Sequence, residues 1–282
     1  MEQKEKTFRL RKKDRELLEA AVESSWVNAP SIKLQPRDYE ILQFILEQKF
    51  ASLETIYFRF FDVRESDSDP LPKNLWTTRQ RLTKLRQQAL LKTEKVLSSG
   101  KAHFLITNQG YKILQEKSGD GYFPIKPAKK IDFSLYEHDV RVSLIRAFIE
   151  SKGFSKRWFS EKWLKASPIF IGHNERFRFS KDLRPDAVYI NSRDQKVSVE
   201  FEMTRKGRLR LRDKIRIYEE LLVPREAFFG TTGRSQVLDK VWVIAMRPAI
   251  ARLYKQIINE IAQDKTKYRV DLYEDVVPEC AR

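Results

Sequence analysis

Strict alternation of apolar and polar side chains distinguishes residues 196–203 from the rest of the chain. The apolar positions are Val197, Val199, Phe201 and Met203, and the polar positions between them are Ser198, Glu200 and Glu202. A period of two residues predicts a β-strand with one buried face. The carboxylates of Glu200 and Glu202 should then point to the same side of the strand, about 7 Å apart.

A second strand is predicted just before this one. Residues 184–186, Arg-Pro-Asp, lead into a short apolar run at 187–190, and the polar residues 191–195 have the length of a hairpin loop. If the two strands pair antiparallel, Asp186 begins one strand near the level at which Glu202 ends the other. Three carboxylates would then converge on one patch.

An amphipathic helix is predicted directly after this hairpin. Its apolar residues recur at helical spacing, at Leu211, Ile215, Tyr218 and Leu222. The segment is rich in basic residues, and Arg208, Arg212 and Arg216 form one stripe along the helix. Clustered carboxylates suit a hard divalent cation, and an adjacent basic stripe suits phosphates. The pattern therefore predicts a metal-assisted phosphodiesterase site.

The N-terminal part shows helical periodicity followed by two short strands. The predicted elements are helices that begin at Asp38, Ser52 and Asn74, strands at 91–97 and 102–107, and a last helix after residue 110. Leu75 and Trp76 are expected to face the core from the third helix. Three helices and a hairpin in this order predict a winged helix-turn-helix.

In a winged helix the third helix enters the major groove of DNA, and the hairpin flanks it. Here both elements are strongly basic, and their only acidic residue is Glu94. The candidate DNA contacts are Arg79, Arg81, Lys84, Arg86, Lys92, Lys95 and Lys101. A solvated helix face is the structural alternative, and winged helices also mediate contacts between proteins.

Length and composition point to two folded domains. The chain has 282 residues, of which 41% are hydrophobic. We expect a charged N-terminal arm at 1–35, a winged helix at 36–117, a linker at 118–131 and a second domain at 132–282. The second domain should have the order αβββαβ around a mixed sheet, which makes the chain α+β overall within the α/β class.

The net charge of +16 makes a polyanionic partner the first expectation. Cys280 is the sole cysteine, which excludes internal disulfides and a cysteine-based zinc site. Neither an apolar signal core nor a run of about 20 apolar residues occurs. The sequence therefore predicts a cytoplasmic protein without a membrane span.

The second domain resembles the PD-(D/E)xK nuclease-like core, and the whole chain is similar to the replication-relaxation family of mobile-element proteins. The resemblance rests on residues 158–161 (W-F-S-E), 184–186 (R-P-D), 200–206 (E-F-E-M-T-R-K) and Tyr218. It covers residues 132–273, and the winged helix in front completes it.

What the resemblance implies is a magnesium or manganese site. Asp186 and Glu200 take the positions of metal ligands, and Glu161 is the upstream acidic ligand, for which Glu137 competes. Glu202 stands where these nucleases usually have lysine. The catalytic set is then Asp186, Glu200 and Glu202, with Lys206 or Lys214 as a migrated lysine; Lys214 and Tyr218 also match the Q-x-x-x-Y positions of related exonucleases.

Plainer alternatives exist for several of these residues. Glu200 and Glu202 could form an exposed strand face paired with Arg205 and Lys206. Glu137 has a ready i,i+4 ion-pair partner in Arg141. The remaining candidates are expected to be structural: His138 as a helix-start residue, and Trp158 and Trp163 as core residues.

Three function classes follow from these patterns. The first is a DNA-binding accessory protein of a plasmid or mobile element, acting in replication, relaxation or mobilisation. The second is an active metal-dependent DNA endonuclease targeted by its winged helix, and the third is a repressor whose C-terminal domain only dimerises. Double-stranded DNA is the expected partner in all three; a relaxase, replication or transposition protein, or a second copy of the chain, would be an additional partner.

Overall fold

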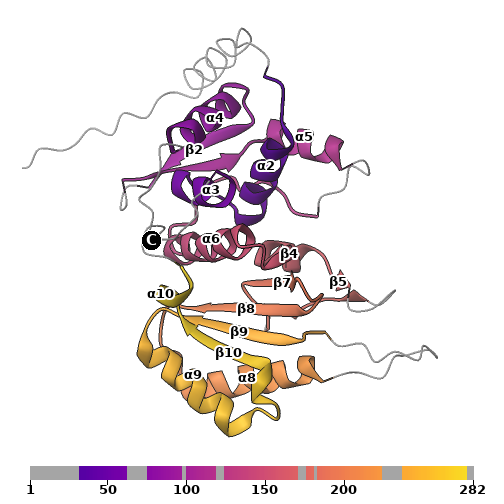
Figure 1. Cartoon of the computed structure of the whole chain (residues 1–282), viewed down its shortest axis with the longest axis vertical. Helices are drawn as coiled ribbons and strands as arrows, with labels where there is room; N and C mark the ends of the chain where they lie inside the picture. The colour runs from indigo at the N-terminus through magenta and orange to yellow at the C-terminus, as the bar shows by residue number, and fades with distance from the viewer. Residues whose placement is uncertain are drawn as a thin grey trace, which may run out of the picture.

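The computed structural model describes residues 32–61, 75–96, 100–118, 124–170, 176–180, 183–223 and 237–277. These residues form an N-terminal part and a C-terminal part, stacked one on the other along the long axis of the molecule (Figure 1). Residues 1–31 of the arm expected at 1–35, and Cys280, lie outside the described residues.

The N-terminal part contains helices around a small sheet. In chain order its elements are α2 (Pro36–Gln48), β1 (Ala51–Ser52), α3 (Leu53–Phe60), α4 (Leu75–Gln87), β2 (Leu91–Lys95), β3 (Ala102–Ile106) and α5 (Asn108–Lys117). The sheet has the strand order β1-β3-β2, and β3 pairs antiparallel with both neighbours. The predicted hairpin is therefore present as β2 and β3.

Two helix starts behave differently from each other. Ser52 caps α3 as predicted, because its hydroxyl accepts the backbone N–H of Thr55. Asp38 does not cap α2: the cap is Gln35, and Asp38 is the third helical residue, which accepts the backbone N–H of Gln35 at 2.7 Å. Proline at the first position starts the helix earlier than the apolar pattern suggested.

Trp76 corrects the expectation for α4. Its side chain was expected in the core, yet the residue is 65% exposed. The buried face of α4 is instead formed by Thr78, Leu82 and Leu85. Trp76 lies close to the helix start, and it shares the opposite face with Arg79 at helical spacing.

The C-terminal part is built on a larger mixed sheet. Its elements are α6 (Tyr136–Ser151), β4 (Ser155–Ser160), α7 (Glu161–Ala166), β5 (Ile169–Phe170), β6 (Arg176–Phe177), β7 (Ala187–Asn191), β8 (Lys196–Glu202), α8 (Arg208–Leu222), β9 (Lys240–Ala245), α9 (Pro248–Ile261), the 3₁₀ turn Lys265–Lys267, β10 (Tyr268–Leu272) and α10 (Tyr273–Val276). Five strands pair in the order β10-β9-β8-β7-β4. The pairs β10–β9 and β9–β8 are parallel, and the pairs β8–β7 and β7–β4 are antiparallel.

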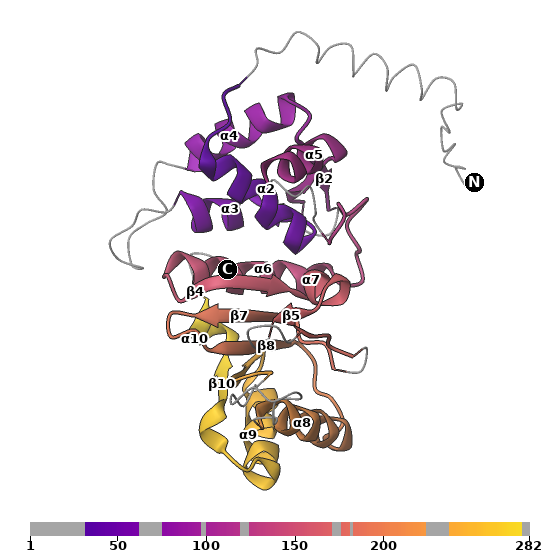
Figure 2. The ribbon, with the colours of Figure 1, turned by 90° about the vertical axis from the view of Figure 1, so that its right-hand side faces the viewer.

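Helices cover both faces of this sheet (Figure 2). Val197, Val199 and Phe201 of β8 belong to the core on the α6 side, whereas Leu211 of α8 and Ile257 of α9 belong to the core on the other side. The strand β8 is therefore buried on both faces, which corrects the prediction of a single buried face. Glu200 and Glu202 are 4% and 3% exposed, so the alternative of an exposed carboxylate face is wrong.

The aromatic and apolar residues of 157–164 predict one strand from the sequence, but the strand ends earlier. β4 stops at Ser160, whose hydroxyl accepts the backbone N–H of Trp163 and caps the short helix α7. Glu161 is consequently the first residue of a helix and not part of a strand. Serine is a favoured residue at the N-terminal cap of a helix. The helix that Ser160 caps replaces the second half of the predicted strand.

The junction between the two parts is itself a packed core. Helix α6 lies between α3 and the sheet (Figure 2). Phe58 of α3 stacks on Phe148 of α6, and Arg59 pairs with Glu150 at 2.6 Å. In the segment expected to be a linker, Ile125 and Ile131 are 2% and 1% exposed. Residues 124–131 are thus packed along the surface and do not form a free tether.

At the level of class, the prediction of a mixed α/β protein, α+β overall with a mixed sheet, is confirmed. Within the described ranges, none of the helices combines the length and the apolar composition needed to cross a bilayer.

Candidate functional site

The antiparallel pair of β7 and β8 brings the predicted carboxylates together. The register places Ala187 opposite Val199, so Asp186 lies at the level of Glu200. Asp186 was expected at the level of Glu202, which is the next residue on the same face of β8. Asp186 is fixed there because its Oδ2 accepts the backbone N–H of Phe201 at 2.7 Å.

Asp186, Glu200 and Glu202 line one pocket of about 680 Å³. Basic side chains form much of the remaining wall, and they come from the strand ends and from α8. They are Arg184, Lys206, Arg210 and Lys214. The carboxylates therefore converge as the sequence predicted, in a concave site with cations around it.

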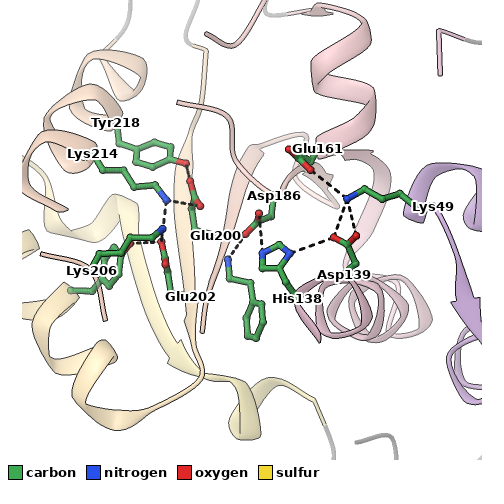
Figure 3. A network of polar contacts seen from close by, with 12 residues as sticks. Lys49, His138, Asp139, Glu161, Asp186, Glu200, Glu202, Lys206, Lys214 and Tyr218 are labelled. Atoms are coloured by element: carbon green, nitrogen blue, oxygen red, sulfur yellow. Dashed lines mark hydrogen bonds and ion pairs between the residues drawn. The ribbon is translucent and has the colours of Figure 1, made fainter. Parts of the chain in front are cut away.

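Glu200 is held by two side chains of α8. Lys214 Nζ lies 2.7 Å from its Oε2, and the hydroxyl of Tyr218 donates to its Oε1 (Figure 3). Since the one Tyr218 proton points to Glu200, Ser198 must donate the 3.1 Å hydrogen bond that it makes with the same hydroxyl. Burial raises the pKa of Glu200, and Asp186 adds to this effect, while Lys214 opposes it.

A single carboxylate oxygen of Glu202 accepts hydrogen bonds from three donors. Its Oε1 lies 2.6 Å from Lys206 Nζ, 3.1 Å from Lys214 Nζ and 2.7 Å from the hydroxyl of Tyr254. Burial alone would raise the pKa of this carboxyl, but the two ammonium groups outweigh burial and lower it. The chain turns sharply after β8, and this turn folds Lys206 back over the strand end.

A line of charged groups runs from Asp186 towards the N-terminal part. His138 Nε2 of α6 is 3.2 Å from Asp186 Oδ1, and His138 Nδ1 is 3.5 Å from Asp139 Oδ1. Asp139 in turn pairs with Lys49, at the end of α2, at 2.8 Å. Figure 3 shows these side chains as one continuous series that ends at the carboxylate pocket.

His138 carries a positive charge at neutral pH. Burial by itself would lower the pKa of the imidazole, but its hydrogen bonds with Asp139 and Asp186 outweigh burial and raise the pKa to about 10. The pKa of Asp186 is lowered in return, because His138 offsets the penalty of burying that carboxylate. His138 is thus the ion-pair partner of Asp186 in the site. This role differs from the structural role expected for it at the helix start.

Glu161 lies apart from the pocket. It shares a small cavity of about 20 Å³ with His138 and Asp139 on the other side of Asp186, and its nearest cation is Lys49 Nζ at 3.7 Å. The competing candidate Glu137 pairs with Arg141 on the surface of α6. Neither residue joins Asp186 and Glu200 as a third carboxylate.

The donor set therefore does not fit a divalent cation. Each oxygen of Asp186 and of Glu200 already has a proton donor, and two of these donors are the cations His138 and Lys214. In the described part of the chain, no group of three or more His, Cys, Asp or Glu side chains is arranged to hold a metal ion.

The basic stripe of α8 is engaged in ion pairs. Arg208 pairs with Glu260 of α9, and Arg212 lies 3.8 Å from the same carboxylate. Arg216 is 3.3 Å from Asp213 one turn earlier. Arg210, which the stripe leaves out, is the arginine of α8 that lines the pocket.

The basic residues of α4 and of the hairpin are mostly exposed. Arg79, Lys84 and Arg86 of α4 are exposed, as are Lys92, Lys95 and Lys101 of the hairpin. Lys92 donates to the carbonyl of Lys129 at 2.6 Å. Arg81 differs, because its guanidinium binds the buried Asp38 of α2, with Nε 2.8 Å from Oδ1. Arg81 therefore joins α4 to α2.

Sequence reasoning missed three members of the site, Lys49, Asp139 and Tyr254. Each comes from a helix far from the motif strands in sequence, and none belongs to the motif pattern. Asp139 directly follows His138 in the first turn of α6, and an acidic pair around a histidine was the one signal available. Lys49 and Tyr254 carried no signal in the sequence.

The chain matches no family model, and no curated protein or solved structure is significantly similar to it. The described residues form an α+β protein in which a basic helix-and-hairpin unit packs on a part with a mixed sheet and a pocket of buried carboxylates.

Proposed function

We propose that this protein is a double-stranded DNA-binding accessory protein of a plasmid or other mobile element, with a nuclease-like C-terminal domain. The proposal extends the resemblance to the replication-relaxation family, and within it the N-terminal part acts as a winged helix. The element order α2-β1-α3-α4-β2-β3 agrees with that assignment.

The observation that carries the proposal is the exposed face of α4. Arg79 and Arg86 are two helical turns apart on one exposed side of the helix, about a quarter turn around it from the buried Thr78, Leu82 and Leu85. Lys84 adds a further charge in the last turn, and the adjacent hairpin carries three exposed lysines. A one-signed helix face beside a basic hairpin suits the major groove and its flanking phosphates.

The decisive variant reverses charge at Arg79, Lys84 and Arg86 together. Arg81 is left intact, because its bond to Asp38 would confuse folding with binding. Binding to a duplex should be lost, measured by fluorescence anisotropy at several salt concentrations. Smaller changes, such as Arg86→Gln alone, should lower the slope of log affinity against log salt by about 1 for each phosphate contact removed.

A matched control also reverses three charges, at Arg247 directly before α9 and at Arg252 and Lys255 in α9, which are exposed and far from α4 (Figure 1). This control should bind DNA with only a small loss that reflects net charge. Equal losses in the two proteins would mean that the net charge of +16, and not α4, accounts for binding, and the proposal would fail.

A second candidate is a metal-dependent DNA endonuclease, with Mg²⁺ or Mn²⁺ at Asp186 and Glu200. One observation favours it: the two carboxylates sit at the same level of paired strands and line a pocket with a lysine. The cations bound to both carboxylates oppose it. Nicking of plasmid DNA that is lost in Asp186→Ala while DNA binding persists would establish this candidate; equal nicking by both proteins would indicate a contaminant.

The repressor alternative requires dispersed carboxylates and an exposed apolar face on the C-terminal part. The convergence of Asp186, Glu200 and Glu202 on one pocket gives it no support. We therefore retain the accessory protein as the proposal. Analytical sedimentation tests whether the chain forms a homodimer.

A further inference from the structure

The ammonium group of Lys214 bridges two buried carboxylates. Its Nζ is 2.7 Å from Glu200 Oε2 and 3.1 Å from Glu202 Oε1. The side chains of the two glutamates are 5% and 3% exposed, and that of Lys214 is 17% exposed. A positive charge between two acidic oxygens is the arrangement that a bridging metal ion would otherwise provide.

Each of the two glutamates also accepts a hydrogen bond from a tyrosine hydroxyl group. Tyr218 donates to Glu200, and Tyr254 donates to Glu202. These donors come from α8 and α9, which cover this face of the sheet (Figure 2). Lys214 lines the pocket, and its position between the two glutamates follows from the packing of α8 on the sheet.

Each of the three buried carboxylates has a cation beside it without any added ion, and Arg184, Arg210 and Asp213 also line the pocket. The carboxylates of Asp186, Glu200 and Glu202 face the cations of His138, Lys206 and Lys214. A divalent ion that entered would meet carboxylates already neutralised, and it would repel the ammonium beside it. Moving Lys214 aside would leave a largely buried ammonium without its partners, which is costly.

We infer that Lys214 is the resident cation of this site and excludes Mg²⁺ and Mn²⁺ from Glu200 and Glu202. The inference concerns the C-terminal pocket alone. It stands apart from DNA binding by α4, so that either can fail without the other.

The inference predicts a gain of metal binding when the ammonium is removed. In Lys214→Met the two glutamates lose their shared cation, and the pocket gains room next to acidic oxygens. Calorimetry with Mn²⁺ should show no uptake by the wild-type chain and uptake of about one ion by Lys214→Met, with Tm rising as Mn²⁺ is added. The free Mn²⁺ signal in electron paramagnetic resonance provides an independent count.

Two control variants separate this effect from a general loss of positive charge. Lys206→Met removes an ammonium from Glu202 but leaves the bridging one in place, so it should not bind Mn²⁺. Lys214→Met combined with Glu200→Gln removes an acidic ligand of the new site, so the gained Mn²⁺ binding should be lost.

Either of two results would overturn the inference. One is Mn²⁺ binding by the wild-type chain that disappears in Glu200→Gln, which would show that a metal displaces Lys214. The other is a folded Lys214→Met protein that takes up no Mn²⁺. If Lys214→Met does not fold, the wild-type titration decides alone: absence of uptake supports the inference, and Glu200-dependent uptake refutes it.

Discussion

Lys49 Nζ lies 2.8 Å from Asp139 Oδ2, and this ion pair joins the residue that ends α2 to the first turn of α6. Lys49 has a φ of 73°, in the left-handed region that lysine rarely adopts. The strained backbone and the ion pair occur in the same residue, at the point where the N-terminal part meets the carboxylate pocket.

Replacing Lys49 should separate the effect of its strained backbone from the effect of its ion pair with Asp139. Lys49→Met removes the ion pair and keeps the strain, and we expect a loss of about 2 kcal/mol in the free energy of unfolding. Lys49→Gly removes both, so it should be more stable than Lys49→Met by about 1 kcal/mol. Urea unfolding of the two variants measures the difference; equal stabilities would argue against strain at this residue.

Arg146 of α6 should be far more important for stability than Arg141 of the same helix. Arg146 pairs with Glu47 at 2.7 Å and with Glu150 at 2.9 Å, and all three side chains are largely buried. Arg146→Met leaves the buried Glu47 without its cation and removes one of the two cations of Glu150, which keeps Arg59; this should cost about 3–5 kcal/mol.

Arg141→Met is the matched control, because Arg141 also pairs at i,i+4 spacing, with the exposed Glu137. That pair should contribute no more than about 0.5 kcal/mol. Comparable losses in urea unfolding for Arg146→Met and Arg141→Met would contradict the importance of burial at this junction.

Glu200 and Glu202 should respond in opposite ways to neutralisation. Like charges on one strand face predict that either Glu→Gln change raises Tm, but the two environments differ. The pKa of Glu202 is lowered from 4.5, so its stabilising effect is present above that pH and is lost on acidification. Glu202→Gln should therefore lower Tm at pH 7, and the gap to wild type should close as the pH falls below 4.5 through the lowered pKa.

Glu200 has a raised pKa, so its protonated form favours folding and that contribution fades as the pH rises. Glu200→Gln mimics the protonated form and should keep or raise Tm at neutral pH. Scanning calorimetry of both variants between pH 7 and about pH 3 tests the pair. A drop for both would mean that the ion pair with Lys214 outweighs burial at Glu200.

His138 should stay protonated through the neutral range. Its raised pKa of about 10 means that its stabilising effect is complete below the usual 6.5 and is lost as the pH approaches 10. The stability gap between wild type and His138→Gln should shrink over that interval. The chain has three histidines, so nuclear magnetic resonance can follow each ring; His103, whose pKa is lowered by burial, provides an internal contrast.

Trp76 should contribute to DNA binding and not to stability. It is 65% exposed near the start of α4, and the first residues of a recognition helix are those that approach base edges. Trp76→Ala should weaken duplex binding by about 1–3 kcal/mol, with Tm unchanged. A fall in Tm with unaltered binding would assign Trp76 to packing instead.

Periodicity predicted most elements of the fold, because strands and helices impose their repeats on the sequence. The hairpin of β7 and β8 and the amphipathic α8 are clear examples. Periodicity did not reveal that the polar face of β8 is also buried. Glu200 and Glu202 look like surface residues until α8 and α9 supply Lys214 and Tyr254 as partners, and those contacts depend on tertiary packing alone.

The candidate site was predicted as a set of residues, and its partners were not. Strand alternation was sufficient to bring Asp186 near Glu200, since only one turn separates their strands. The series from Lys49 through Asp139 to His138 joins the end of α2 to the first turn of α6, which lies 90 residues later in the sequence. Glu161 begins a helix for a local reason, because Ser160 caps that helix where the apolar residues predicted a strand.

Helix α6 has a consequence for how this chain can be divided or recombined. Phe148 and Glu150 of α6 complete the packing of Phe58 and Arg59 of α3, yet α6 also covers the sheet. A cut near residue 131 would strip both halves of a shared surface. A fragment intended to carry DNA binding alone should therefore extend through Ser151. Exchange of the two halves between related chains is expected to succeed only when α3 and α6 come from the same chain.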